Sequence, residues 1–192
     1  MKSKNTIHVE TPNLVSSTFS YYSKPISNTI PESQVTLVDV YNLIRGDDFI
    51  AVTQKLRGIS DTKVARKYKA YHFNYVTFSG TFSKRNNDSL IRHSGLLTID
   101  FDHIVDIIGL KEQLLVDPYF ETQLLFISPS SDGLKWIIPI DPSLEFHHKY
   151  FDAVSNYVLA TYNLAIDPNG REVSRACFLP HDSEAYINPK YL

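Results

Sequence analysis

An apolar strand that ends in two acidic residues constrains the fold of this chain more than any other feature. Residues 96–102 read Leu-Leu-Thr-Ile-Asp-Phe-Asp. Successive side chains of a strand point to opposite faces, so the odd-numbered residues are expected in the core and Asp100 and Asp102 on the other face. Two carboxylates about 7 Å apart on one face repel each other unless a cation or a basic group lies between them.

Hard oxygen ligands of this kind suit Mg²⁺ or Mn²⁺. The alternative is a pair of solvated acids at a strand end, or an N-cap for a helix that begins near Ile104. The motif alone does not decide between these interpretations.

The pattern around this strand predicts an α+β fold, a mainly antiparallel sheet with helices packed on it. Hydrophobic periodicity predicts five helices, at residues 36–43, 48–56, 60–68, 104–116 and 146–162. It predicts strands at residues 75–82, 96–102, 123–128, 134–140 and 175–179. Ser60 is the expected N-cap of the third helix. Residues 1–34, rich in Pro, Ser, Thr and Asn, are expected to form an extended arm with one edge strand near residues 18–22, ahead of a single domain over residues 35–192.

Composition excludes several classes of protein. Hydrophobic residues make up 43% of the 192 residues and aromatic residues 12%, which is typical of a globular protein and not of a disordered one. No apolar run approaches the roughly 20 residues that cross a membrane, and the N-terminus lacks the apolar core of a signal peptide. The single cysteine, Cys177, cannot form an internal disulfide, so a cytoplasmic location is expected.

Charge is distributed unevenly along the chain. Residues 55–92 carry nine basic and two acidic side chains, a net charge of +7, whereas the rest carries ten basic and nineteen acidic side chains, a net charge of −9. This separation suggests a surface for nucleic acid, and the alternative is a solvated basic helix. The candidate contacts are Lys63, Arg66, Lys67, Lys84 and Arg85.

Two further segments carry candidate binding residues. The turn Ser-Pro-Ser-Ser-Asp-Gly at residues 128–133 can present N–H groups and hydroxyls to phosphate, and Lys135 follows it. An ordinary hairpin turn with an exposed lysine is the alternative. In residues 166–175, Asp167 is a candidate third carboxylate, and Arg171 and Arg175 are candidates for bidentate phosphate binding. There the alternative is an Asp-Pro-Asn-Gly turn with surface ion pairs to Glu172. The histidines show no zinc spacing, and the pair at 147–148 is expected to be solvated.

Taken in chain order, these motifs resemble archaeo-eukaryotic-type primase-polymerase domains. That pattern has an apolar strand with Asp-x-Asp, a Ser/Gly turn that enters a strand, and an apolar-Asp motif followed by arginines. More closely, the chain resembles the VirE N-terminal family of Bacteroides-type mobile elements over about residues 55–190. The matching stretches are residues 78–82 with Arg85, 94–96, 100–102, 128–136 and 174–179.

The resemblance implies a primase-polymerase (RRM-like) catalytic core that acts on DNA and nucleoside triphosphates in mobile-element replication. It implies that Asp100, Asp102 and Asp167 hold two divalent ions, Mg²⁺ or Mn²⁺. It also implies an incoming triphosphate bound by Ser128, Ser131, Gly133, Lys135, Arg171 and Arg175.

The superfamily usually has His where this chain has Lys135. A catalytically inactive module that binds DNA or a partner therefore stands beside the nucleotidyltransferase as an alternative. In related proteins the domain often precedes a helicase-like region, which is a possible partner.

Overall fold

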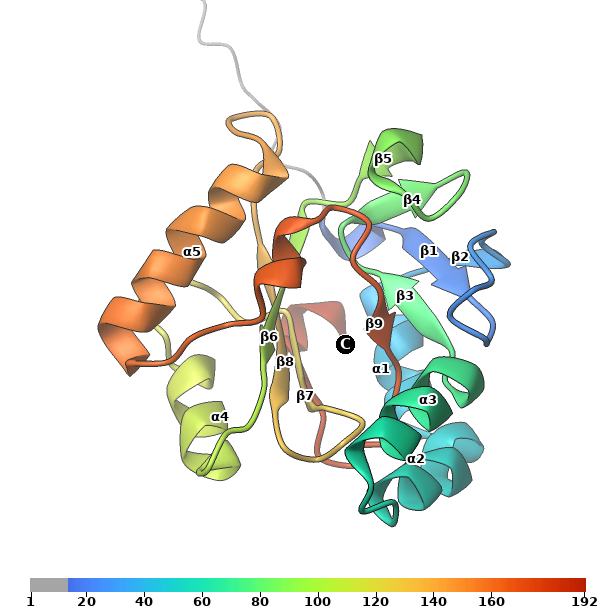
Figure 1. Cartoon of the computed structure of the whole chain (residues 1–192). Helices are drawn as coiled ribbons and strands as arrows, with labels where there is room; N and C mark the ends of the chain where they lie inside the picture. Colours follow the sequence, from blue (N-terminus) through green and yellow to red (C-terminus); the bar gives the residue numbers. More distant parts are fainter. Residues whose placement is uncertain (1–13) are drawn as a thin grey trace, which may run out of the picture.

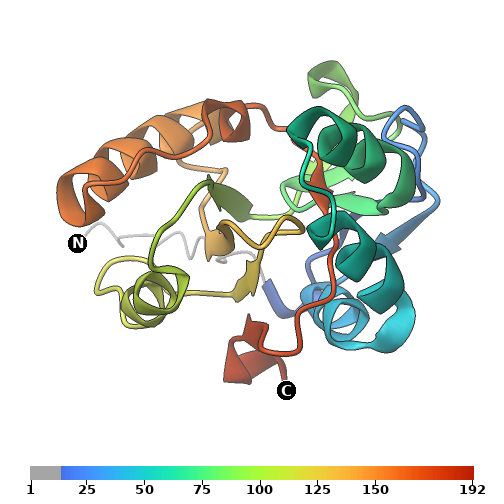
Figure 2. The same ribbon diagram turned by 60° about the horizontal axis from the view of Figure 1, so that its bottom comes forward.

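The computed structural model describes residues 14–192. These residues form two four-stranded antiparallel sheets with helices packed against them. One sheet has the strand order β2-β1-β3-β9 and the other has the order β10-β7-β8-β6, while β4 and β5 form a separate hairpin. Figures 1 and 2 show helices α4 and α5 on one side of the second sheet, with α1, α2 and α3 on the other side. The predicted α+β class with antiparallel strands is confirmed.

The helices and strands of the described residues have the following bounds. The helices are α1 Leu37–Arg45, α2 Ile50–Arg57, α3 Thr62–His72, α4 Ile107–Leu115 and α5 His147–Tyr162. The strands are β1 Phe19–Tyr22, β2 Ser33–Val35, β3 Tyr75–Thr77, β4 Gly80–Phe82, β5 Leu90–His93, β6 Leu96–Phe101, β7 Leu124–Ile127, β8 Leu134–Pro139, β9 Cys177–Phe178 and β10 Tyr186–Ile187. Short 3-10 turns are η1 Leu14–Ser16, η2 Asp47–Phe49, η3 Asn87–Ser89, η4 Pro168–Arg171 and η5 Pro189–Tyr191.

Strand β6 is covered on both faces, which explains its continuous apolar run. Leu97, Ile99 and Phe101 pack with residues of α4 and α5 in one hydrophobic cluster. On the opposite face, Leu96 belongs to the second cluster, between the two sheets. The alternation predicted from residues 96–102 is therefore confirmed, and Asp100 follows Leu96 on the face toward the first sheet.

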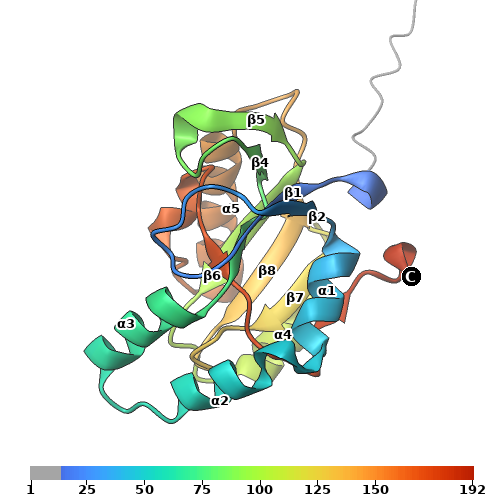
Figure 3. The same ribbon diagram turned by 90° about the vertical axis from the view of Figure 1, so that its right-hand side faces the viewer.

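Helix α1 closes the space between the sheets. Leu37, Val40 and Ile44 recur on one face of the helix and are buried among residues of β1, β3 and β7. Figure 3 shows α1 lying across β7. A capping box fixes the start of the helix, because the Thr36 hydroxyl accepts from Asp39 N and the Asp39 carboxylate accepts from Thr36 N.

The segment predicted as an extended arm contributes instead to the first sheet. Residues 1–13 lie outside the described part of the chain. The strand expected near residues 18–22 is present as β1, but it pairs with β2 on one side and β3 on the other, so it is an inner strand and not an edge strand. Phe19 and Tyr22 of β1 are fully buried, where their rings pack against Phe78 and Tyr75 respectively.

Two other boundaries differ from the prediction. Helix α3 begins at Thr62, and its N-cap is Asp61, whose carboxylate accepts from Lys63 N and Val64 N, so Ser60 is not the cap. The single strand predicted at residues 75–82 is two strands, β3 and β4, which belong to different sheets. None of the helices in residues 14–192 is long and apolar enough to span a membrane.

Candidate functional site

Three carboxylates converge where β6 ends. Asp100 is the fifth residue of β6, Asp102 follows the strand, and Asp167 is the N-cap of η4. The backbone N–H of Asp167 donates to the carbonyl of Asp100 at 3.0 Å, which holds η4 against the strand. One carboxylate oxygen from each residue lies within 4.8 Å of the other two. The structure thus brings together the three aspartates that the sequence predicted as a cluster.

The three carboxylates differ in their exposure to water. The side chains of Asp100 and Asp167 are 10% and 12% exposed, whereas Asp102 lies at the surface end of the cluster. Partial burial of Asp102, and next the charge of Asp100, raise its pKa above the usual value for an aspartate. The negative charge of Asp100 thus adds to the effect of burial in disfavouring the ionised form of Asp102.

Two basic side chains neutralise the inner part of the cluster. Lys135 is the direct register partner of Asp100 across β6 and β8, and its ammonium forms an ion pair with Asp100 Oδ1. Arg175 forms an ion pair with Asp167 and lies 3.6 Å from Asp100 Oδ2. Three carboxylates thus face two cations, which leaves one negative charge near Asp102.

The donor set fits a divalent cation. It consists of carboxylate oxygens, the ligands that Mg²⁺ and Mn²⁺ prefer. The buried Asp100 Oδ1 makes no hydrogen bond within residues 14–192, although it forms an ion pair with the Lys135 ammonium. An oxygen in this state has lone pairs left for a metal ion or a water molecule.

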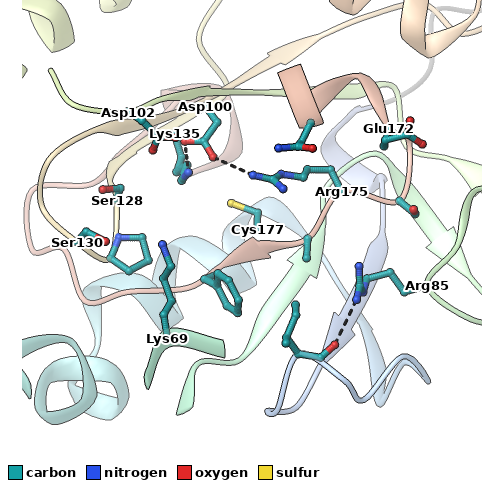
Figure 4. Close-up of a pocket in the computed structure, with 16 residues that line it drawn as sticks. Lys69, Arg85, Asp100, Asp102, Ser128, Ser130, Lys135, Glu172, Arg175 and Cys177 are labelled. Atoms are coloured by element: carbon teal, nitrogen blue, oxygen red, sulfur yellow. Dashed lines mark hydrogen bonds and ion pairs between the residues drawn. The ribbon is translucent and has the colours of Figure 1, made fainter. Parts of the chain in front are cut away.

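A cleft of about 380 Å³ opens between the two sheets beside this cluster. Figure 4 shows Asp100, Lys135 and Arg175 on one wall and Lys69 on the opposite wall. Cys177 of β9 also lines the cleft, and burial raises the pKa of its thiol to about 12, which makes the nucleophilic thiolate scarce. The cleft is therefore lined by both acidic and basic side chains.

The turn between β7 and β8 contributes only part of the predicted phosphate site. Ser128 and Ser130 line the cleft, but Ser131 and Gly133 are not among its lining residues. The N–H groups of Ser128 and Ser131 bond to carbonyls within the turn, so they are not free for an anion. Gly133 has a packing role, because a Cβ there would lie 1.9 Å from the Phe101 carbonyl oxygen.

Arg171 does not reach the cleft, contrary to the prediction for phosphate binding. Its guanidinium binds the Asp152 carboxylate of α5 in bidentate fashion, at 2.8 and 3.1 Å. Arg171 lines a different hollow, which has Glu172 in common with the cleft. The ion pair is with Asp152 and not with Glu172, the partner expected in the surface alternative.

The basic residues predicted to bind nucleic acid fall into separate groups. Lys63, Arg66 and Lys67 are exposed on α3, and Lys84 is exposed beyond β4. Arg85 lines the cleft, but its guanidinium already donates to Tyr75 Oη and to the Ile26 carbonyl, both at 3.2 Å. Arg85 thus holds the wall of the cleft in place.

Sequence reasoning missed a half-buried pair of histidines near α5. His147 was expected in solvent, yet its ring packs against His93, with His93 Nε2 3.1 Å from His147 Nδ1. The Gly95 N–H donates to His93 Nδ1 at 3.0 Å, so His93 carries its proton on Nε2 and donates it to His147. His147 in turn donates from Nε2 to the Gly170 carbonyl in η4. No spacing in the sequence indicates this contact, because β5 and α5 meet only in the fold.

Residues 67–187 of the chain match the family model described as BT4734-like, N-terminal domain. The chain belongs to this family. The matched span contains the three aspartates, Lys135 and Arg175. No curated protein and no solved structure matches the chain. The resemblance of the motifs to VirE N-terminal and primase-polymerase domains stays a prediction.

Proposed function

We propose that this domain is a divalent-metal-dependent nucleotidyltransferase of the primase-polymerase type, which acts on nucleoside triphosphates and DNA. One observation carries the proposal: Asp100, Asp102 and Asp167 place carboxylate oxygens within 4.8 Å of one another at the wall of a basic-rimmed cleft. A cluster of hard oxygen ligands beside fixed positive charge is what phosphoryl-transfer chemistry requires.

In this proposal each residue of the cleft has a separate task. Asp102, the most exposed carboxylate, and the inner pair Asp100 and Asp167 hold Mg²⁺ or Mn²⁺. A metal ion bound there would act as a Lewis acid that neutralises charge on the reacting phosphate. Lys135 and Arg175 form ion pairs with the inner carboxylates and offer their remaining N–H donors to the triphosphate.

The test is Mn²⁺-dependent extension of a primed DNA template by the full chain, together with calorimetric Mn²⁺ binding. Asp102→Asn is the informative variant, because this carboxylate has no ion pair in the described residues and its loss leaves the Lys135 pair intact. Asp88→Asn, on the exposed turn η3, is the matched control. We expect incorporation by the wild type and the control and none by Asp102→Asn. Equal Mn²⁺ affinity of Asp102→Asn and the wild type would overturn the proposal.

A second candidate function rests on the ion pair itself. Because the Lys135 ammonium already neutralises Asp100, the cluster is also compatible with a catalytically inactive module that binds nucleotide or DNA without metal. This candidate predicts DNA binding that weakens with salt and does not depend on Mn²⁺. Metal-dependent incorporation excludes it.

A further inference from the structure

Lys69 brings an uncommitted positive charge into the cleft. Its side chain extends from the last turns of α3 and points toward Lys135 and Cys177 (Figure 4). Within the described chain its ammonium makes no hydrogen bond and no ion pair, and its one recorded contact is with the ring of Phe178, 5.9 Å from Nζ to the centroid. Lys135 and Arg175, by contrast, are both held by carboxylates.

This arrangement is unfavourable for a charged lysine without a ligand. Burial, and next the nearby Lys135 ammonium, lower the pKa of Lys69, while Asp100, Asp102 and Asp132 act in the opposite direction. An ammonium that has lost part of its hydration and has no hydrogen-bonded acceptor gains strongly from a bound anion.

The location of Lys69 indicates which anion fits. A second hollow of about 310 Å³ adjoins the cleft, and Lys69, Asp102 and Ser130 line both. The α3 side of this second hollow also carries the exposed Arg66. A ligand that extends from the cleft into the second hollow therefore passes Lys69 and then Arg66.

We propose that Lys69 binds a phosphate group of the ligand at the junction of the two hollows. The inference rests on the proposed function, because it names the residue that receives one phosphate of the ligand. The phosphate belongs either to a polyphosphate tail or to the backbone of a nucleic-acid strand, which share the same chemistry. A lysine ammonium with three donors suits either one.

The test measures binding of sodium tripolyphosphate and of a short single-stranded oligothymidylate to the full chain, separately and in EDTA. Lys69→Met removes the charge, Lys69→Arg keeps it, and Lys149→Met is the matched control, on the exposed side of α5 and outside the lining of both hollows. We expect Lys69→Met to weaken binding of at least one probe about tenfold, since a hydrogen bond between charged groups is lost. Lys69→Arg should restore it, and Lys149→Met should bind both probes as the wild type does.

A pH series separates binding from a structural role. Because the pKa of Lys69 is lowered, wild-type affinity should decline with rising pH earlier than the affinity of Lys69→Arg, whose guanidinium stays charged. Loss confined to tripolyphosphate assigns Lys69 to a polyphosphate tail, and loss confined to the oligonucleotide assigns it to a strand. Wild-type affinity of Lys69→Met for both probes would overturn the inference.

The two proposals fail separately. EDTA removes any metal requirement, so a Lys69 effect that persists while primer extension is absent would retain the phosphate site and reject the nucleotidyltransferase. Primer extension by the wild type, together with unchanged phosphate binding by Lys69→Met, would retain the nucleotidyltransferase and reject the phosphate site at Lys69.

Discussion

Asp100 and Lys135 are directly opposite each other on β6 and β8, and their side chains form an ion pair that is about nine-tenths buried. The pairing is a consequence of strand register, since residues that face each other on an antiparallel pair project to the same side. A single-residue slip of either strand would move one partner to the opposite face. The charge balance of the candidate site is therefore fixed by the sheet.

Replacing Lys135 by Met should destabilise the fold and increase the stabilisation that the protein gains from Mn²⁺. Removing one partner of a buried pair leaves an uncompensated charge, and we expect the free energy of unfolding to fall by about 3 kcal/mol, with Arg175 moderating the loss. Mn²⁺ should restore more stability to this variant than it adds to the wild type, because the ammonium no longer occupies Asp100. Urea unfolding with and without Mn²⁺ measures both effects.

Lys149→Met, on the exposed side of α5, serves as the control for the Lys135 experiment and should change neither quantity. Equal Mn²⁺ stabilisation of the Lys135 variant and the wild type would show that the ammonium does not compete with the ion.

The histidine pair predicts a loss of stability in mild acid. Burial, and then the neighbouring His147 ring, lower the pKa of His93 from 6.5 to about 4. Between these pH values the unfolded chain binds a proton that the folded chain does not, so stability present above pH 6.5 is lost as the pH falls, by about 3 kcal/mol in all. Besides His93, the charged or titratable neighbours of His147 are His148, which follows it on α5, and Glu172.

The measurement for the histidine pair is the free energy of unfolding between pH 7 and pH 4. His93→Asn keeps an acceptor for the Gly95 N–H but removes the titrating ring, so its pH dependence should be flatter. His72→Asn, at the exposed end of α3, should retain the wild-type slope. A wild-type slope in His93→Asn would refute the assignment.

Gly133 should tolerate no side chain. A Cβ at this position would meet the Phe101 carbonyl oxygen at 1.9 Å, where Phe101 ends β6 and Gly133 directly precedes β8. Gly133→Ala is expected to lower the free energy of unfolding by about 1–3 kcal/mol, as overpacking of a tight contact does. Gly58→Ala is the matched control, since its Cβ would lie 3.6 Å from the nearest backbone oxygen. Similar thermal midpoints for the two variants would contradict this account.

Cys177 should report on the integrity of the cleft wall. Its raised pKa, about 12 against 9.0 for an ordinary thiol, makes the reactive thiolate about a thousandfold scarcer at pH 8. Alkylation by iodoacetamide should therefore be slow in the native protein and fast in denaturant, and Cys177→Ala should abolish it because the chain has one cysteine. Equal rates in the two states would mean that the thiol is already accessible.

The acidic strand was predictable because its information is local. Alternation in residues 96–102 specifies both the strand and the shared face of Asp100 and Asp102, and the apolar spacing of residues 146–162 specifies α5. The convergence of Asp167 with this strand followed from the resemblance of the motifs and not from any spacing in the sequence.

The features that could not be predicted depend on contacts between distant segments. Strands β2, β5 and β10 have two to four residues each, too few to show a period, and pairing with another strand defines them. Arg171 could not be separated from Arg175 by sequence, because the choice depends on Asp152 of α5 being close to one of them. Lys69 was one basic residue among several on α3, and only packing against β9 turns it toward the cleft.

The hydrogen bond from Asp167 to the carbonyl of Asp100 has a consequence for any dissection of this protein. It joins the start of η4 to strand β6, so a fragment truncated before η4 keeps two of the three clustered carboxylates and loses that of Asp167. A truncated or fused version of this protein therefore needs the whole segment from β6 through η4 to keep the three carboxylates together.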